Sequence, residues 1–170
     1  MTALSDLRVI DLSTDVAGSL CTKMFADFGA DVIKVEPPTG RGEVRSLGPF
    51  PNGYRNPETS GMHLYLNANK RGITLNVESR QGISILRELV TTADIVVESF
   101  APGVMAEIGL DFGSLEELRP GSSPQRALTE VTSSSSVGQE TISGRIRLAT
   151  SAYLFASVIR NASDRYINFL

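Results

Sequence analysis

The chain has 170 residues, of which 41% are hydrophobic and 21% charged, and its net charge is −3. This is the composition of a globular protein with a core, and its acidic balance excludes a broad basic surface for nucleic acid or anionic lipid. No apolar run approaches the ~20 residues of a membrane span. Residues 1–6 lack the basic and apolar regions of a signal peptide, so we expect a cytoplasmic protein.

The first 35 residues predict a βαβ unit. Residues 7–12 and 31–35 have the apolar pattern of buried strands, and Gly29 ends the helix between them as a C′ glycine. The apolar stripe of this helix is predicted from Leu20, Met24 and Phe28, with Cys21 and Phe25 beside it. Cys21, the single cysteine, is expected to be a small buried side chain in a reducing compartment.

Residues 36–69 are rich in proline and glycine and predict a long loop, which is uncommon unless it is functional or covers a site. A strand is predicted at 73–77, and Ser79 is a candidate N-cap for a helix through Ala93. The buried stripe of that helix is predicted from Ile83, Leu86, Leu89 and Val90.

Residues 94–98 are apolar enough for a parallel strand that is covered on both faces. Strands and helices alternate up to this point, which predicts an α/β fold with a Rossmann-like parallel sheet and flanking helices. A capping box at 114–117 predicts a short helix ending near Pro120, and 127–131 is a candidate strand. We expect a core over residues 1–120 and a weaker continuation over 121–170, with a Ser-rich loop at 132–144. Residues 148–159 fit a helix or a strand pair equally well.

Three segments are candidates for ligand contact. The turn at 13–18 opens the first helix, where backbone N–H groups can face a phosphate, although it lacks the G-x-G-x-x-G pattern of a dinucleotide site. Lys70 and Arg71 precede a strand, where one cation can meet a phosphate and the other a carboxylate. A plain βα turn and a solvated start of a strand are the respective alternatives.

The third candidate segment, 98–104, follows an apolar strand at the edge where open α/β sheets bind ligands. Phe100 can stack on an adenine ring, and Pro102 with Gly103 lets the backbone approach closely. A hydrophobic plug over the sheet edge fits the same residues.

Other chemistry has little support in the sequence. His63, the only histidine, is interpreted as a surface residue of the long loop, and no Cys/His cluster predicts a metal site. No G-x-S-x-G elbow is present. The carboxylates are interpreted as strand ends and solvated helix faces: Asp11, Asp15, Asp27, Asp31 and Glu36. The residues by themselves therefore predict a ligand-binding α/β domain and no specific reaction.

The sequence of these segments resembles the class III CoA-transferase family of the CaiB/BaiF type, which includes formyl-CoA and L-carnitine CoA-transferases and α-methylacyl-CoA racemases. The matching residues are 7–18, 28–36, 69–75, 93–104 and 108–110, in the family's order and spacing. A weaker continuation includes 128–132, 138–139 and 149–156, and residues 163–165 resemble an Asp-Arg turn that precedes the family's catalytic segment.

The resemblance implies a Rossmann-like large domain, a smaller second domain and an interlocked homodimer that acts on acyl-CoA. CoA is then a substrate, with no tightly bound cofactor, metal, nucleic acid or membrane partner. The positions implied to contact CoA are Asp15, Val16, Ala17, Lys70, Arg71, Leu75, Ser99, Phe100, Pro102, Gly103 and Val104. Pro37, Glu78, Ser99 and Glu107 stand where formyl-CoA transferase has Arg, Lys, Asn and Arg, and a carboxylate in place of a cation repels a phosphate.

In the transferases of this family, an aspartate attacks the thioester and forms an acyl anhydride, whereas the racemases move the α-proton with a His and an Asp. That aspartate follows the Asp-Arg turn, and residues 166–170 contain none. The sequence therefore predicts a CoA-transferase family member without its own catalytic residue. The alternatives are an acyl-CoA-binding partner subunit completed by a second chain, a racemase-like relative, and a decayed remnant.

Overall fold

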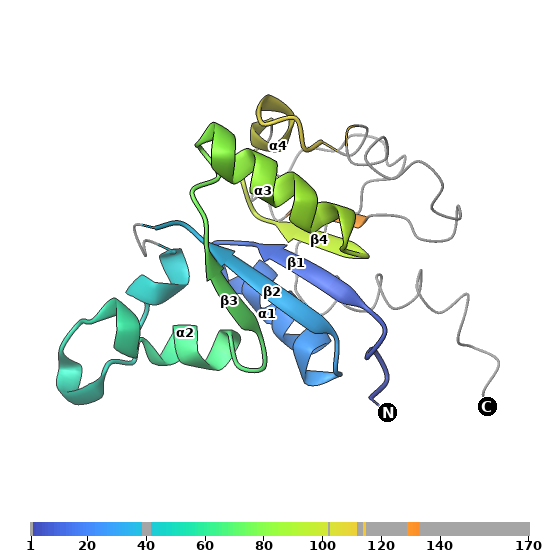
Figure 1. Cartoon of the computed structure of the whole chain (residues 1–170). Coiled ribbons are helices and arrows are strands. Elements are labelled where there is room, and N and C mark those ends of the chain that lie inside the picture. The colour runs from blue at the N-terminus through green and yellow to red at the C-terminus, as the bar shows by residue number, and fades with distance from the viewer. Residues whose placement is uncertain (1, 39–41, 102, 112–113, 115–128, 133–170) are drawn as a thin grey trace, which may run out of the picture.

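The computed structural model describes residues 2–38, 42–101, 103–111, 114 and 129–132. Its regular elements, in chain order, are β1 (Arg8–Leu12), α1 (Val16–Asp27), β2 (Asp31–Glu36), the 3₁₀ helices η1 (Glu43–Ser46), η2 (Pro51–Gly53) and η3 (Pro57–Thr59), α2 (Gly61–Leu66), β3 (Arg71–Thr74), α3 (Arg80–Thr91), β4 (Ile95–Glu98), α4 (Val104–Glu107) and β5 (Thr129–Thr132). The five strands form a parallel sheet in the order β3-β2-β1-β4-β5 (Figure 1). The predicted Rossmann-like α/β sheet is confirmed.

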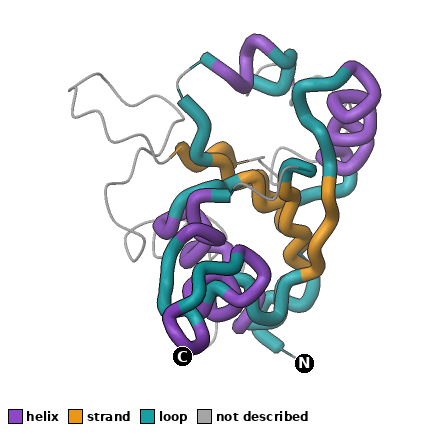
Figure 2. Tube along the Cα trace, turned by 90° about the vertical axis from the view of Figure 1, so that its left-hand side faces the viewer, coloured by secondary structure: helices purple, strands orange, loops and turns teal. Residues whose placement is uncertain are grey.

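Helices cover both faces of the sheet, as the two views show (Figures 1 and 2). Alternating side chains of β1 divide the core between these faces. Val9 packs with Cys21 and Phe25 of α1, and Ile10 packs with Leu86 of α3. This pleat also turns Asp11 toward the side of the sheet that α1 covers.

The buried face of α1 differs from the predicted stripe. Cys21 and Phe25 face the sheet and are fully buried, whereas Phe28 is 48% exposed. Leu20 and Met24 are only partly covered. The reason is the start of the helix: Asp15 is the N-cap, and the buried Gly18, one turn before Cys21 and two turns before Phe25, lies close against Ser13.

Helix α3 agrees better with its pattern. The Ser79 hydroxyl accepts a hydrogen bond from the Gly82 N–H (3.0 Å), so the predicted N-cap is confirmed. Leu86 and Val90 are fully buried, and Ile83 and Leu89 are partly buried. Gly29 has φ +100°, which confirms its place after the end of α1.

Two boundaries differ from the prediction. The segment 36–69 is not a plain loop: it holds η1, η2, η3 and α2. Strand β3 runs from Arg71 to Thr74 and not from 73 to 77, because the backbone turns at Asn76, whose carbonyl accepts the Ser79 N–H (3.2 Å).

The second half of the chain was predicted in less detail, and most of it lies outside the described residues. Strand β5 (Thr129–Thr132) overlaps the candidate strand at 127–131. The described residues do not include 115–120 of the predicted short helix, the Ser-rich loop, residues 148–159 or the Asp-Arg turn. The division at residue 120 stays a prediction.

Candidate functional site

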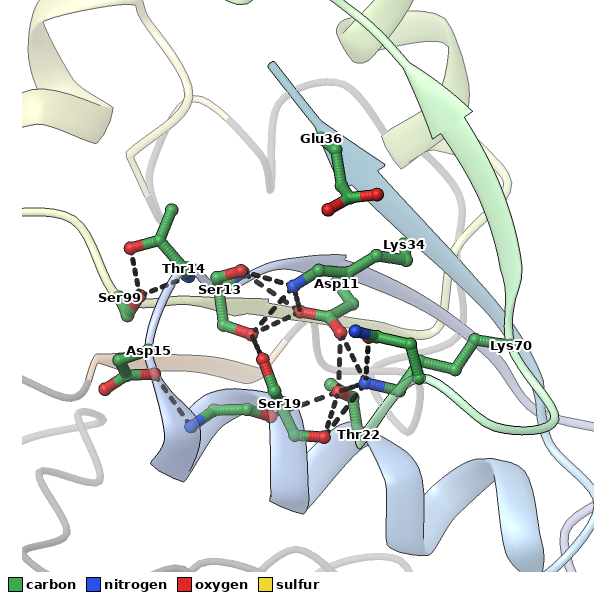
Figure 3. A network of polar contacts seen from close by, with 12 residues as sticks. Asp11, Ser13, Thr14, Asp15, Ser19, Thr22, Lys34, Glu36, Lys70 and Ser99 are labelled. Carbon is green, nitrogen blue, oxygen red and sulfur yellow. Dashed lines mark hydrogen bonds and ion pairs between the residues drawn. The ribbon is translucent and has the colours of Figure 1, made fainter. Parts of the chain in front are cut away.

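The strand order places a topological switch point between β1 and β4, because the chain leaves β1 toward β2 and later returns to the other side of β1 at β4. Thr14 follows β1 and Ser99 follows β4 at this edge. The Thr14 N–H donates to Ser99 Oγ (2.8 Å), and the two hydroxyl oxygens are 3.3 Å apart (Figure 3). These bonds join the two candidate segments of the sequence, 13–18 and 98–104.

The start of α1 opens onto this switch point. Asp15 caps the helix, and its Oδ1 accepts the Gly18 N–H (2.9 Å). Val16 is 37% exposed and Ala17 is partly exposed. Gly18 is required for the tight turn, because a Cβ there would lie 2.4 Å from Ser13 Cβ. The first turn of a helix carries N–H groups without helical partners, so it suits an anionic ligand.

The segment after β4 contributes apolar groups. Phe100 and Leu75 are partly buried and pack against the core cluster on the α3 face. This packing favours a hydrophobic plug over the sheet edge as strongly as it favours stacking of Phe100 on an adenine ring. Gly103 has φ +97° and precedes α4, and Val104 is partly exposed. Pro102 lies outside the described residues.

Lys70 and Arg71 both pair with carboxylates. Arg71 Nη2 lies 2.6 Å from Asp31 Oδ2, which also accepts Arg8 Nε (2.8 Å). The side chain of Lys70 is only 1% exposed, and its Nζ lies 3.0 Å from Asp11 Oδ2. Lys70 is therefore part of the interior of the protein, and direct contact with a ligand phosphate stays a prediction.

A buried charged cluster lies beneath the β1–α1 turn (Figure 3). Asp11 is fully buried, and its carboxylate accepts Lys34 Nζ (3.1 Å), Lys70 Nζ (3.0 Å), the Thr22 hydroxyl (2.6 Å), and the Ser13 N–H and hydroxyl (2.9 and 2.5 Å). Asp11 lies near the end of β1 as interpreted, but it is buried and paired, which the sequence interpretation did not include.

Burial and the charges of this cluster together shift two pKa values. Burial by itself would raise the pKa of Asp11, but the ammonium groups of Lys34 and Lys70, with the two hydroxyl bonds, outweigh it, and that pKa is lowered. Burial lowers the pKa of Lys70 to about 8, although the Asp11 carboxylate opposes the shift. One carboxylate thus faces two buried ammonium groups, an arrangement that needs exact hydrogen bonding to be stable.

The sequence contains a signal for this cluster. Asp11 lies two residues after Val9, and Lys34 two residues after Val32, so strand alternation puts both polar side chains on the α1 face. The parallel register makes Asp11 and Lys34 direct partners. A charged residue within an otherwise apolar strand, as at Asp11 and Lys34, was therefore the indication of a buried ion pair that the sequence offered.

A second polar group lies at the carboxyl end of β2. Arg45 Nε and Nη2 each donate to Glu36 (2.7 Å), and His63 Nδ1 is 3.0 Å from Asn67 Nδ2. The Arg45 bonds hold η1 against the end of the strand, whereas the His63–Asn67 contact is internal to α2 and its C-cap. A cavity of about 10 Å³, lined also by Thr14 and Pro37, separates them from the β1–α1 turn and has room for one water molecule.

His63 does not lie freely on the surface, because its side chain is only 13% exposed. Burial lowers its pKa, with Arg45 acting in the same direction.

Cys21 is fully buried, and burial raises its pKa to about 12, so the thiol is a packing group as predicted. In the described part of the chain, no three His, Cys, Asp or Glu side chains are grouped to hold a metal ion. No described helix has the length and apolar character to span a membrane.

The fold defines a Rossmann-like α/β domain, and its candidate ligand-binding edge is at the β1–β4 switch point. The chain belongs to CoA-transferase family III, because the sequence model of that family matches residues 4–121. It is 40% identical over 119 residues to a succinate–glutarate CoA-transferase of Agrobacterium fabrum, covering 69% of this chain and 30% of the relative. It is 36% identical over 122 residues to a formyl-CoA:oxalate CoA-transferase of Streptomyces avermitilis, covering 69% of this chain and 28% of the relative.

Solved structures share the fold of this chain. A hypothetical protein from Mycobacterium tuberculosis matches with a TM-score of 0.62 at 30% identity, over 78% of this chain and 33% of its own. A CaiB/BaiF family protein from Brucella suis has the same fold, with a TM-score of 0.73 at 24% identity, over 96% of this chain and 50% of its own. The chain spans under a third of the length of the two curated relatives.

Proposed function

We propose that residues 1–121 form the CoA-binding part of a CoA-transferase and hold the nucleotide end of an acyl-CoA at the β1–β4 switch point. The observation that carries the proposal is the Thr14–Ser99 contact, which brings the first turn of α1 beside the segment that follows β4. Backbone N–H groups at the helix start suit the diphosphate, and Phe100 offers an apolar surface to the adenine. The names of the two curated relatives, both CoA-transferases, support the same ligand.

The reaction proposed for the whole protein is transfer of CoA from an acyl thioester to a carboxylic acid, with CoA as a dissociating substrate in the cytoplasm. The family's aspartate nucleophile follows its Asp-Arg turn, which the resemblance puts at residues 163–165, outside the matched span of 4–121. We therefore infer that CoA binding and acyl transfer belong to separate parts of the protein. In this proposal the catalytic carboxylate reaches the bound thioester from a part of the family's fold outside residues 4–121.

Calorimetric titration of the full 170-residue chain with acetyl-CoA tests the binding. We expect a micromolar Kd for the natural sequence. Val16→Glu adds a carboxylate at the first helical position, which favours the helix but repels a phosphate at the same place, and should weaken binding by about tenfold.

Ile85→Glu is the matched control, because Ile85 is 47% exposed on α3 and receives the same new charge at a distance from the switch point. It should leave the Kd unchanged. A folded natural chain that binds no acetyl-CoA, or equal effects of the two variants, contradicts the proposed site. Acetyl-phosphopantetheine, which lacks the nucleotide, should bind much more weakly than acetyl-CoA.

A further inference from the structure

Two buried lysines hold main-chain carbonyls on either side of the point where α1 begins. Lys34 Nζ donates to the Ser13 carbonyl, in the turn, and is 3.2 Å from the Ser13 hydroxyl. Lys70 Nζ donates to the Ser19 carbonyl (2.9 Å), in the first turn of the helix. The lysines come from β2 and from the residue before β3, so the start of the helix is fastened to two neighbouring strands.

Asp11 joins these attachments into one unit. Its carboxylate binds both ammonium groups, the Ser13 N–H and the Thr22 hydroxyl. Residues 14–17, which lead into the first turn of α1, lie between Ser13 and Thr22. Residues on both sides of 14–17 are therefore bound to the same buried carboxylate (Figure 3).

We propose that Asp11 and Lys70 are positioning residues for the ligand site: without touching the ligand, they hold the β1–α1 turn in the geometry that binds an acyl-CoA. This inference rests on the proposed function. Side chains that are 0% and 1% exposed have no surface for a ligand, so their influence passes through Ser13, Ser19 and Thr22. Lys70 acts on the far end of the turn, where its Nζ also lies 2.8 Å from Thr22 Oγ1.

The charge of Lys70 gives this role a signature. The charged and titratable groups around it are Asp11 on β1, Cys21 and Asp27 on α1, and Lys34 on β2. Because its pKa is about 8, Lys70 loses its proton within a pH range in which binding can be measured. A neutral amine makes weaker hydrogen bonds to the Ser19 carbonyl and the Asp11 carboxylate than an ammonium does, so the turn loosens as the proton leaves.

The test is a pH series from 7 to 9 on the full chain, with two measurements at each pH. The first is the Kd of acetyl-CoA, whose sulfur carries no titrating proton. The second is the ¹⁵N chemical shift of the amides of residues 13–19 without ligand. We expect these amides to titrate with a midpoint near 8, and the affinity to fall about fivefold over the series.

Lys70→Arg keeps the positive charge throughout this range, so in this variant both pH dependences should vanish. If the arginine variant does not fold, the series on the natural chain still decides.

Amides that do not respond near pH 8 overturn the positioning role, whether or not acetyl-CoA binds. Amides that respond in a chain that binds no acetyl-CoA at any pH overturn the proposed function, and with it the assignment of this turn as a ligand site. An affinity that stays constant while the amides titrate also rejects the positioning role.

Discussion

Asp11 and Lys34 are direct partners in the parallel register of β1 and β2, on the face of the sheet that α1 covers, with Lys34 Nζ 3.1 Å from Asp11 Oδ1. Both side chains are removed from water, at 0% and 7% exposure. Lys70 approaches the other carboxylate oxygen, so Asp11 is the shared anion of two buried cations. The cluster depends on this one carboxylate more than on either lysine.

Replacing Asp11 with Asn should therefore destabilise the protein strongly, because it leaves two buried ammonium groups without their counter-charge. We expect a loss of about 3–5 kcal/mol in the free energy of unfolding. Urea titration followed by circular dichroism measures it. Asp31→Asn is the control: Asp31 pairs with Arg8 and Arg71 at the surface, and its loss should change the stability by at most ~1 kcal/mol. Similar losses in the two variants contradict the structural importance of the cluster.

The sequence was sufficient to predict the fold where local patterns and tertiary packing agree. Apolar runs predicted β1, β2 and β4, and the capping chemistry of Ser79 and Gly29 placed helix ends correctly. The stripe of α1 was misread because periodicity alone does not say which of two adjacent apolar stripes faces the sheet. That choice was made by the close approach of Gly18 to Ser13, a tertiary contact.

The candidate site was predictable in position but not in its internal bonding. The rule that parallel sheets bind ligands at their carboxyl edge located both Thr14 and Ser99, yet their hydrogen bond joins residues 85 positions apart. Asp11, Lys34 and Lys70 form their cluster through strand register, which the sequence does not state. The partial burial of His63 likewise depends on α2 packing near Glu36 and Arg45.

Gly18→Ala tests the closeness of the β1–α1 turn. The new Cβ would lie 2.4 Å from Ser13 Cβ and 3.0 Å from Asp15 Oδ1, so the turn or the helix must move. We expect a destabilisation of about 1–3 kcal/mol and weaker binding of acetyl-CoA. Gly72→Ala on β3 is the matched control, because a Cβ there meets no atom within 4 Å. Equal urea midpoints for the two variants would show that the turn is looser than the structure describes.

Ser99→Ala tests the contact across the switch point. It removes the oxygen that accepts the Thr14 N–H, and a partly buried donor without its acceptor should reduce the stability by about 1 kcal/mol. The Kd of acetyl-CoA should rise as the two segments separate. Ser84→Ala, at an exposed position of α3, removes the same hydroxyl without a comparable effect. If calorimetry gives the same Kd for both variants, the Thr14–Ser99 contact does not form part of the ligand site.

The pKa of Lys70 predicts an unusual dependence of stability on alkaline pH. Its value in the folded protein is about 8, below its ordinary 10.5, so between these values the unfolded chain binds more protons than the folded one. The free energy of unfolding should therefore rise with pH once the pH passes 8. The affinity for acetyl-CoA is expected to fall over the same pH range. If Lys70 served stability alone, the affinity would instead follow the free energy of unfolding and rise with it.

Cys21 opposes this trend at higher pH. Burial raises its pKa from 9.0 to about 12, so above pH 9 the unfolded chain loses a proton that the folded chain keeps, and stability falls. The rise from Lys70 should thus be clearest between pH 8 and 9, and in a Cys21→Ala variant it should continue toward pH 10.5. Urea titrations at half-unit pH intervals measure both curves. A natural chain whose stability falls steadily from pH 8 to 9, with the same fall in Cys21→Ala, would mean that Lys70 keeps its proton and that its burial is incomplete.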